Sequence, residues 1–186
     1  MLLARRPLLL AAAALLLLGG CPWLSEAEPC EVTSATEISL VLANADGAVS
    51  DVAEDGPLPL ISAPQGGFIA LVAPRVRVAS SACQLQINAA LREVSGAGRV
   101  IGLEERPITV HRRADGWAAP ENPAGLSDLA NVAVCPSSVT TAIDGQPFRL
   151  EVRVLDQGGG APLVEASATV RPTCTSAFCR SSCMLQ

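Results

Sequence analysis

The chain has no lysine and no tyrosine, and it has a single histidine, His111, among its 186 residues. Without lysine there is no P-loop lysine, no Schiff-base nucleophile and no Ser-x-x-Lys dyad. One histidine excludes the usual zinc and copper sites that use two. The sequence also lacks a Gly-x-Ser-x-Gly motif. These absences remove the common catalytic and nucleotide-binding constellations, so we expect a protein that is not an enzyme and carries no cofactor.

Positive charge is scarce as well. The chain has 18 acidic and 13 basic residues, which gives a net charge of −5. Two of the basic residues, Arg5 and Arg6, lie in the N-terminal segment, so the remainder is close to −7. A nucleic-acid partner needs clustered positive charge. The composition therefore predicts no nucleic-acid partner.

The N-terminal segment carries the most informative pattern. Arg5 and Arg6 precede the apolar run Leu8–Leu18, which has the length of a signal-peptide core and is shorter than the roughly 20 residues of a spanning helix. The following Leu18-Gly19-Gly20-Cys21 resembles the lipobox of bacterial lipoproteins at all four positions. The resemblance implies cleavage before Cys21, acylation of Cys21 and membrane attachment, and Pro22 in place of Asp favours the outer membrane. An ordinary secretory signal or an uncleaved anchor are the alternatives.

These features predict three parts of the chain. Residues 1–20 form a helical lipoprotein signal peptide, and residues 21–30 contain the lipidated cysteine and a short acidic tether. Residues 31–186 are long enough for one domain with its own core. The predicted location is the cell envelope, on the periplasmic or the surface face of the outer membrane.

Six cysteines remain after Cys21. They are Cys30, Cys83, Cys135, Cys174, Cys179 and Cys183. An even number in an exported chain predicts three disulfides, of which the cluster at 174–183 holds at most one internally. Strand parity directs Cys83 inward and Cys135 ends a strand, which favours a Cys83–Cys135 bridge, one bridge inside the tail and one from the tail to Cys30. Other pairings stay open, and so does a thiolate metal site, although the tail lacks Cys-x-x-Cys spacing; we predict no metal.

Alternating apolar residues predict strands through the rest of the chain. The clearest are Cys83–Leu91 and Phe148–Val154, the second forming a hairpin with 164–170. Phe68–Val72 is apolar on both faces, as in a central strand. Shorter candidates lie at 38–42, 58–62, 99–102, 107–113 and 131–135, and Asp-Gly turns at 46–47, 55–56, 115–116 and 144–145. Only Leu126–Asn131 could form a helical turn or two. The pattern predicts an all-β domain, an antiparallel Ig-like β-sandwich of about 7–9 strands.

A second resemblance covers most of residues 31–183. Pro64-Gln65-Gly66-Gly67 leads into the strand at Phe68, Gly145-Gln146-Pro147-Phe148 opens a later hairpin, and the tail is rich in cysteine. In these features the chain is similar to uncharacterised lipoproteins of the myxobacterial type. The resemblance implies an Ig-like sandwich and brings no known activity.

Three side-chain groups are candidate site residues. His111 faces outward beside two arginines, which is typical of a surface histidine; a Ser-His-Asp role would need partners that the sequence does not identify. Trp117 lies in the irregular stretch 114–125, where it could contact a ligand or fold back over the domain edge. Glu104 and Glu105 are adjacent in a strand, so they point to opposite faces and cannot act there as a carboxylate pair.

Three hypotheses for function follow. The first is a lipid-anchored, non-enzymatic binding or structural domain of the envelope. The second is an accessory subunit of an envelope or secretion complex, which pairs a strand edge with a protein partner. The third is a hydrolase that uses carboxylates or a serine with His111.

Overall fold

The computed structural model describes residues 28–32, 37–120, 128–135, 142–155 and 162–183. The predicted signal helix, Cys21 and the tether up to residue 27 lie outside these ranges, and so do the first two residues of the possible helical turn at 126–131. The last two residues of that segment, Ala130 and Asn131, begin a strand and not a helical turn. Within the described ranges, no helix has the length and apolar character needed to cross a membrane.

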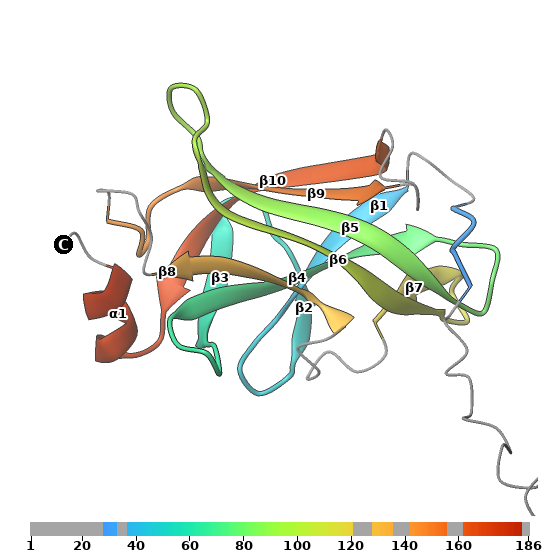
Figure 1. The fold of residues 1–186 in the computed structure, drawn as a ribbon, viewed down its shortest axis with the longest axis horizontal. Coiled ribbons are helices and arrows are strands. Elements are labelled where there is room, and N and C mark those ends of the chain that lie inside the picture. The colour runs from blue at the N-terminus through green and yellow to red at the C-terminus, as the bar shows by residue number, and fades with distance from the viewer. Residues whose placement is uncertain (1–27, 33–36, 121–127, 136–141, 156–161, 184–186) are drawn as a thin grey trace, which may run out of the picture.

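The described chain is mostly β, with one short helix (Figure 1). The strands are β1 (Ile38–Ala43), β2 (Val49–Asp51), β3 (Gly56–Ser62), β4 (Phe68–Arg77), β5 (Ala82–Glu93), β6 (Val100–Arg112), β7 (Trp117–Ala119), β8 (Ala130–Cys135), β9 (Phe148–Leu155) and β10 (Pro162–Cys174), and the helix is α1 (Ala177–Cys183). The alternating strands were predicted correctly. The segments 99–102 and 107–113, predicted as separate strands, belong to the single long strand β6, and the helix was not predicted.

The strands close into a barrel. Seven of them pair in the cyclic order β4-β3-β10-β9-β5-β6-β7 and back to β4, while β1, β2 and β8 lie outside this ring. The predicted Ig-like sandwich of 7–9 strands is therefore wrong. The two layers that a sandwich would keep apart are joined here by hydrogen-bonded strands on both sides, through β3 on one side and the short β7 on the other.

Strand β4 is the hub of the sheet. On one edge it pairs first with β3 and then with β1; on the other it pairs first with β8 and then with β7. Because neighbours cover both its edges and both its faces, Phe68–Ala73 are buried without interruption. This explains the run of apolar residues on both faces, which predicted a central strand correctly.

Strand β10 closes the other side by changing partners. Its first part is antiparallel to β9 as far as Val170, and from Val170 to Cys174 it is parallel to β3. The turn before β3 is fixed to β10 at the same place, because the backbone N–H of Thr169 donates to the Glu54 carboxylate at 3.2 Å and the backbone N–H of Asp55 donates to the Thr169 carbonyl. Side-chain and backbone hydrogen bonds from Thr169 lower the pKa of Glu54.

Gly102 lies where β8 packs against the inner face of β6. A Cβ atom built at Gly102 would overlap the carbonyl oxygen of Ala133 and lie 2.9 Å from Cγ1 of Val132. No β6–β8 ladder forms; the two strands meet face to face, and only glycine permits this separation. Arg106 on β6 reinforces the contact by donating to the carbonyl of Leu129, just before β8, at 3.2 Å.

The barrel interior is apolar, and no polar or charged residue of the described chain is buried. Side chains on the outer face form ion pairs across strands, with Glu151 of β9 placed among Arg92, Arg149 and Arg153. The predicted Asp-Gly turns are confirmed: three of their glycines have positive φ, and at 55–56 the aspartate has it instead, with φ 55° at Asp55.

Candidate functional site

The chain enters the barrel beside the first residues of β5. Glu28 accepts a hydrogen bond from the backbone of Gln84 at 2.8 Å, Cys30 donates back to Gln84 at 3.0 Å, and Cys30 is disulfide-bonded to Cys83. We call this end of the barrel the entry end. It contains the start of β5, the end of β6 and the short strand β7. The β5–β6 turn, the end of β8 and α1 lie at the opposite end, the far end (Figure 1). Any tether before Glu28 is thus fixed to the entry end.

Trp117 is the first residue of β7, at the entry end. The guanidinium of Arg77 lies over its ring at 4.5 Å from the centroid, and that of Arg75 lies at 5.4 Å. Arg77 is held in place by Glu37, with Nε to Oε2 at 2.6 Å, and by the carbonyl of Asp115. Trp117 is half-buried, so of the two predicted roles the structure favours folding back onto the domain. The Trp117 ring makes cation–π contacts with these guanidinium groups and does not offer a free face to a ligand.

A hollow lies on the outer face of β4 next to this tryptophan. It has a volume of about 220 Å³ and is lined by Val41, Val49, Ser50, Asp51, Arg75, Arg113, Ala119, Pro120 and Leu129. Arg75 forms an ion pair with Asp51 across it, with Nη1 to Oδ1 at 2.9 Å. Ligand sites for small molecules usually exceed about 300 Å³, so the hollow suits a few atoms of a ligand rather than a substrate held for catalysis.

The predicted outward position of His111 is confirmed, because Ile108 and Val110 are buried and His111 is half-exposed. His111 pairs in the sheet with Ala82 and Ala119 and does not line the hollow. The two adjacent glutamates of β6 diverge as predicted. Glu104 pairs with Arg106 at 2.6 Å, while Glu105 accepts from Gln86 and Asn88 of β5.

The disulfides differ from the favoured pairing. Three bridges form, and they are Cys30–Cys83, Cys135–Cys183 and Cys174–Cys179. Three disulfides and one bridge inside the tail are confirmed, and Cys83 is buried as parity predicted. The Cys83–Cys135 bridge and the tail-to-Cys30 bridge are wrong. Cys83 lies at the entry end and Cys135 at the far end, so no side-chain rotation could join them.

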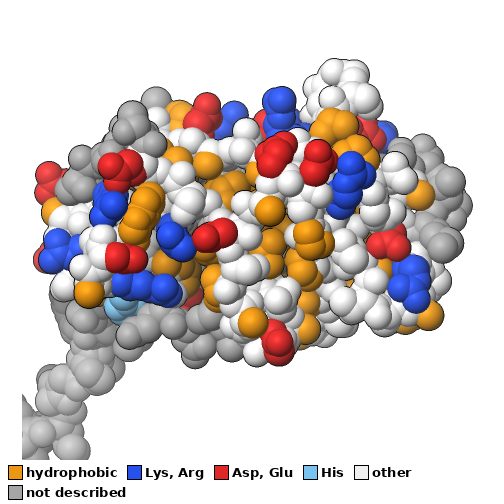
Figure 2. Space-filling view, turned by 180° about the vertical axis from the view of Figure 1, so that it is seen from behind, with side chains coloured by type: hydrophobic (Ala, Val, Ile, Leu, Met, Phe, Trp, Pro, Cys, Tyr) orange, Lys and Arg blue, Asp and Glu red, His pale blue; other side chains and the backbone are white. Residues whose placement is uncertain are grey.

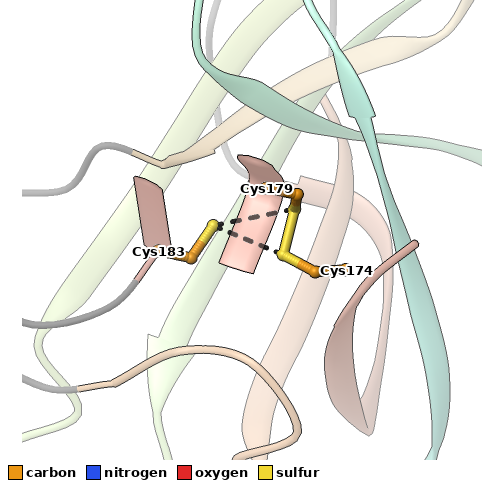
Figure 3. Close-up of side chains that lie close together, drawn as sticks. All are labelled: Cys174, Cys179 and Cys183. Atoms are coloured by element: carbon orange, nitrogen blue, oxygen red, sulfur yellow. Dashed lines mark hydrogen bonds between the residues drawn. A yellow bond between two sulfur atoms is a disulfide. The ribbon is translucent and has the colours of Figure 1, made fainter. Parts of the chain in front are cut away.

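The far end brings four cysteines together. Cys135 ends β8, Cys174 ends β10, and the short helix α1 contributes the other two. The Cys183 sulfur lies 3.7 Å from that of Cys174 and 3.9 Å from that of Cys179 (Figure 3). These similar distances place the Cys183 sulfur beside the Cys174–Cys179 bond and not in line with it, whereas disulfide exchange proceeds by attack of a thiolate on one sulfur. We call these four residues the sulfur cluster.

Six large apolar side chains of the described residues are exposed; Val49 of β2 and Leu163 of β10 are two of them, and the other four lie toward the far end. On the β5–β6 hairpin, Val94, Val100 and Leu103 are 53%, 38% and 56% exposed, and on α1 Phe178 is 72% exposed. Strand register places Leu103 and Val100 on the outer face, because Leu103 pairs with Ala90 and Val100 with Arg92, and Val94 lies in the turn directly after β5. Figure 2 shows hydrophobic side chains at the base of the projecting hairpin and in the middle of this face, among acidic and basic side chains that are spread over it, with the histidine at the end opposite the hairpin.

Sequence reasoning did not identify the arginines around Trp117, the hollow or the far-end apolar side chains. One pattern in the sequence could have indicated the arginines. Arg75 and Arg77 alternate with the buried Val76 on the strand that also contains Phe68–Val72. Comparison with known proteins found no matching protein family, no matching curated protein and no matching solved structure.

Proposed function

We propose that the chain is a lipid-anchored envelope domain, held at the outer membrane by acyl chains on Cys21, which acts as a binding or structural module and not as an enzyme. The observation that supports this most is the polarity of the barrel. The described chain starts at the entry end, and four of the six exposed large apolar side chains of the described residues lie toward the far end. An anchored module needs this arrangement, because the surface that meets a partner must point away from the membrane.

The tether limits how far the domain can stand from the membrane. Seven chain steps separate Cys21 from Glu28, and they span at most about 25 Å. The entry end, with β7 and Trp117, would therefore lie next to the lipid surface. The hairpin side chains Val94, Val100 and Leu103 would face the periplasm or the medium, where a protein partner can reach them.

Two observations favour binding over catalysis. The hollow next to Trp117 is small, and His111 is not among its lining residues. A hydrolase that uses a serine with His111 needs a cleft containing His111, and the hollow does not provide one. The resemblance to myxobacterial-type lipoproteins is part of the proposal and implies the same location without an activity.

Membrane fractionation with acyl labelling tests the anchor. Cys21→Ser should lose a labelled fatty acid and move from the membrane to the soluble fraction. The double substitution Cys30→Ser/Cys83→Ser is the control, because it removes two cysteines and leaves the lipobox intact; it should stay labelled and bound. If the Cys21→Ser protein stays acylated and membrane-bound, the anchor is not at Cys21.

Site-specific photo-crosslinking in the native envelope tests the binding surface. A crosslinker at Leu103 should capture a protein partner, and one at Arg113, at the entry end, should capture lipid or nothing. A single stoichiometric partner at Leu103 would mark the chain as an accessory subunit of a complex. Protein capture at Arg113 with none at Leu103 would refute the proposed orientation.

A further inference from the structure

The sheet face beside the hollow has hydrogen-bonding capacity that the protein does not use. Among the described residues, three buried side-chain atoms have no hydrogen-bond partner, and they are Ser39 Oγ, Arg75 Nε and Asn131 Oδ1. All three lie on one face of β4, because Ser39 pairs with Arg75 and Asn131 pairs with Leu71, which is four residues before Arg75. Buried polar atoms without a partner are uncommon in folded proteins, and a bound water or ion is one explanation for them.

Arg75 lines the hollow and has donors to spare. A guanidinium carries five N–H groups, and Arg75 donates through Nη1 to Asp51 at 2.9 Å while its Nε has no partner. The ion pair with Asp51 and the Trp117 ring, 5.4 Å away, fix the position of the group. The planar fork of a guanidinium matches the oxygens of an oxyanion. Arg75 is therefore a preorganised donor for an anion in the hollow.

A second guanidinium lines the same hollow. Arg113 is exposed and forms no ion pair with any residue that the structure describes. Its backbone N–H donates to the carbonyl of Trp117 at 2.8 Å, which fixes the point from which the side chain extends. Two arginines against Asp51 give the charged side chains of the lining a formal charge of +1, in a chain whose net charge is −5. The hollow is thus a local site for an anion in an acidic protein.

The donors in the hollow suit a phosphate group better than a carboxylate. Ser50 adds a hydroxyl to the two guanidinium groups of the lining. A phosphate presents three or four oxygens and can accept from three such donors at once, whereas a carboxylate has two oxygens. The volume of about 220 Å³ is several times the roughly 30 Å³ that one water occupies in the liquid. It therefore has room for a phosphate group with some of its hydration.

We propose that the hollow binds one phosphate group, with Arg75 and Arg113 as its donors, and that this phosphate belongs to the headgroup of a membrane lipid. The choice of a lipid rests on the proposed function, which places the entry end next to the membrane. A soluble phosphate ester is the other source of the same chemistry. With a headgroup in the hollow, the domain has a second contact with the membrane besides its acyl chains, and this contact fixes the orientation of the barrel.

Equilibrium dialysis of radiolabelled inorganic phosphate against the full chain in micelles of a neutral detergent tests the site. We expect saturable binding of one phosphate per chain. Phosphatidic acid added to the micelles is then compared with soluble glycerol phosphate as a competitor, and oleate at the same micelle charge controls for general repulsion. Stronger competition by phosphatidic acid supports the lipid headgroup. Equal or stronger competition by glycerol phosphate supports the phosphate site and overturns its assignment to a lipid.

Two substitutions with opposite effects make the result specific to the hollow. Arg113→Gln should weaken phosphate binding about tenfold, because it removes a charge-assisted donor. Asp51→Asn should strengthen it about fivefold, because it removes a carboxylate that competes for Arg75 and repels the anion. Damage to the fold would weaken binding in both variants. Arg149→Gln, which removes an arginine that is 62% exposed on β9, is the control and should leave binding unchanged.

No saturable binding, weaker binding by Asp51→Asn, or equal effects of Arg113→Gln and Arg149→Gln would overturn the proposal. Cys21→Ser should bind phosphate as the unsubstituted chain does, because the measurement does not depend on the anchor. If Cys21→Ser leaves the membrane and phosphate does not bind, the anchor stands and the phosphate site is wrong. If phosphate binds and Cys21→Ser stays on the membrane, the site stands and the proposed anchor is wrong.

Discussion

The face-to-face contact at Gly102 predicts a large effect from a single methyl group. In Gly102→Ala the new Cβ would overlap the Ala133 carbonyl oxygen and crowd Val132. Ordinary contact distances are about 3.5–4 Å, so β8 would have to move away from β6 by more than 1 Å. Neither neighbour is a flexible side-chain end, because one is backbone and the other is a buried β-branched residue.

Overpacking a well-packed core costs typically about 1–3 kcal/mol. We expect the upper half of that range, about 2–3 kcal/mol, because the backbone of β8 must shift together with its pairing to β4. For a domain of this size, each kcal/mol lowers the melting temperature by about 2–4 °C. Gly102→Ala should therefore melt roughly 5–10 °C below the unsubstituted chain.

Urea denaturation and thermal melting followed by circular dichroism give both quantities. Leu103→Ala is the matched control, because the neighbouring side chain points to the outer face and is 56% exposed; exposed positions usually change stability by less than about 0.5 kcal/mol. If Gly102→Ala changes the free energy of unfolding by no more than this control does, β8 does not pack against Gly102 and the account of this side of the barrel is wrong.

Two further predictions concern the outer surface. In a double-mutant cycle of Arg77→Met and Trp117→Leu, the coupling energy should be about 0.5–1 kcal/mol, as for a partly exposed cation–π pair; additive effects would show that the guanidinium does not interact with the ring. For Glu54, the folded pKa is lowered, so its stabilising effect is present above the unfolded pKa and is lost as pH falls through the folded one. The stability advantage over Glu54→Gln should shrink between neutral and acidic pH in thermal melts, and an advantage that grows on acidification would contradict the assigned contact.

The strands themselves could be predicted because apolar alternation fixes which side of a strand is buried. Cys83–Leu91 and Phe148–Val154 were assigned in this way, and the inward position of Cys83 followed from parity. The closure of the sheet could not be predicted. It depends on β10 changing partners at Val170 and on β7, a strand of three residues, and neither leaves a periodic pattern in the sequence.

The candidate site residues also divide into features that the sequence predicts and features that it does not. Parity placed His111 outward and separated Glu104 from Glu105, which are local properties of one strand. The disulfide partners were missed because pairing depends on which end of the barrel each cysteine reaches. Cys135 meets Cys183 through α1, a seven-residue helix that is too short to produce a detectable period in the sequence.

The positions of the disulfides also decide how the molecule responds to tension. Suppose that the chain is pulled between a membrane anchor at one end and a partner bound near α1. The Cys30–Cys83 bridge then keeps the chain between its two cysteines, a sequence separation of 53, from stretching. The Cys135–Cys183 bridge does the same over a sequence separation of 48. Only the segment from Cys83 to Cys135 can then extend, by a contour length of at most roughly 180 Å. Strands β1–β4 and β9–β10 lie within the cross-linked loops, so an oxidised barrel would lengthen under force by a fixed amount set by its cysteines.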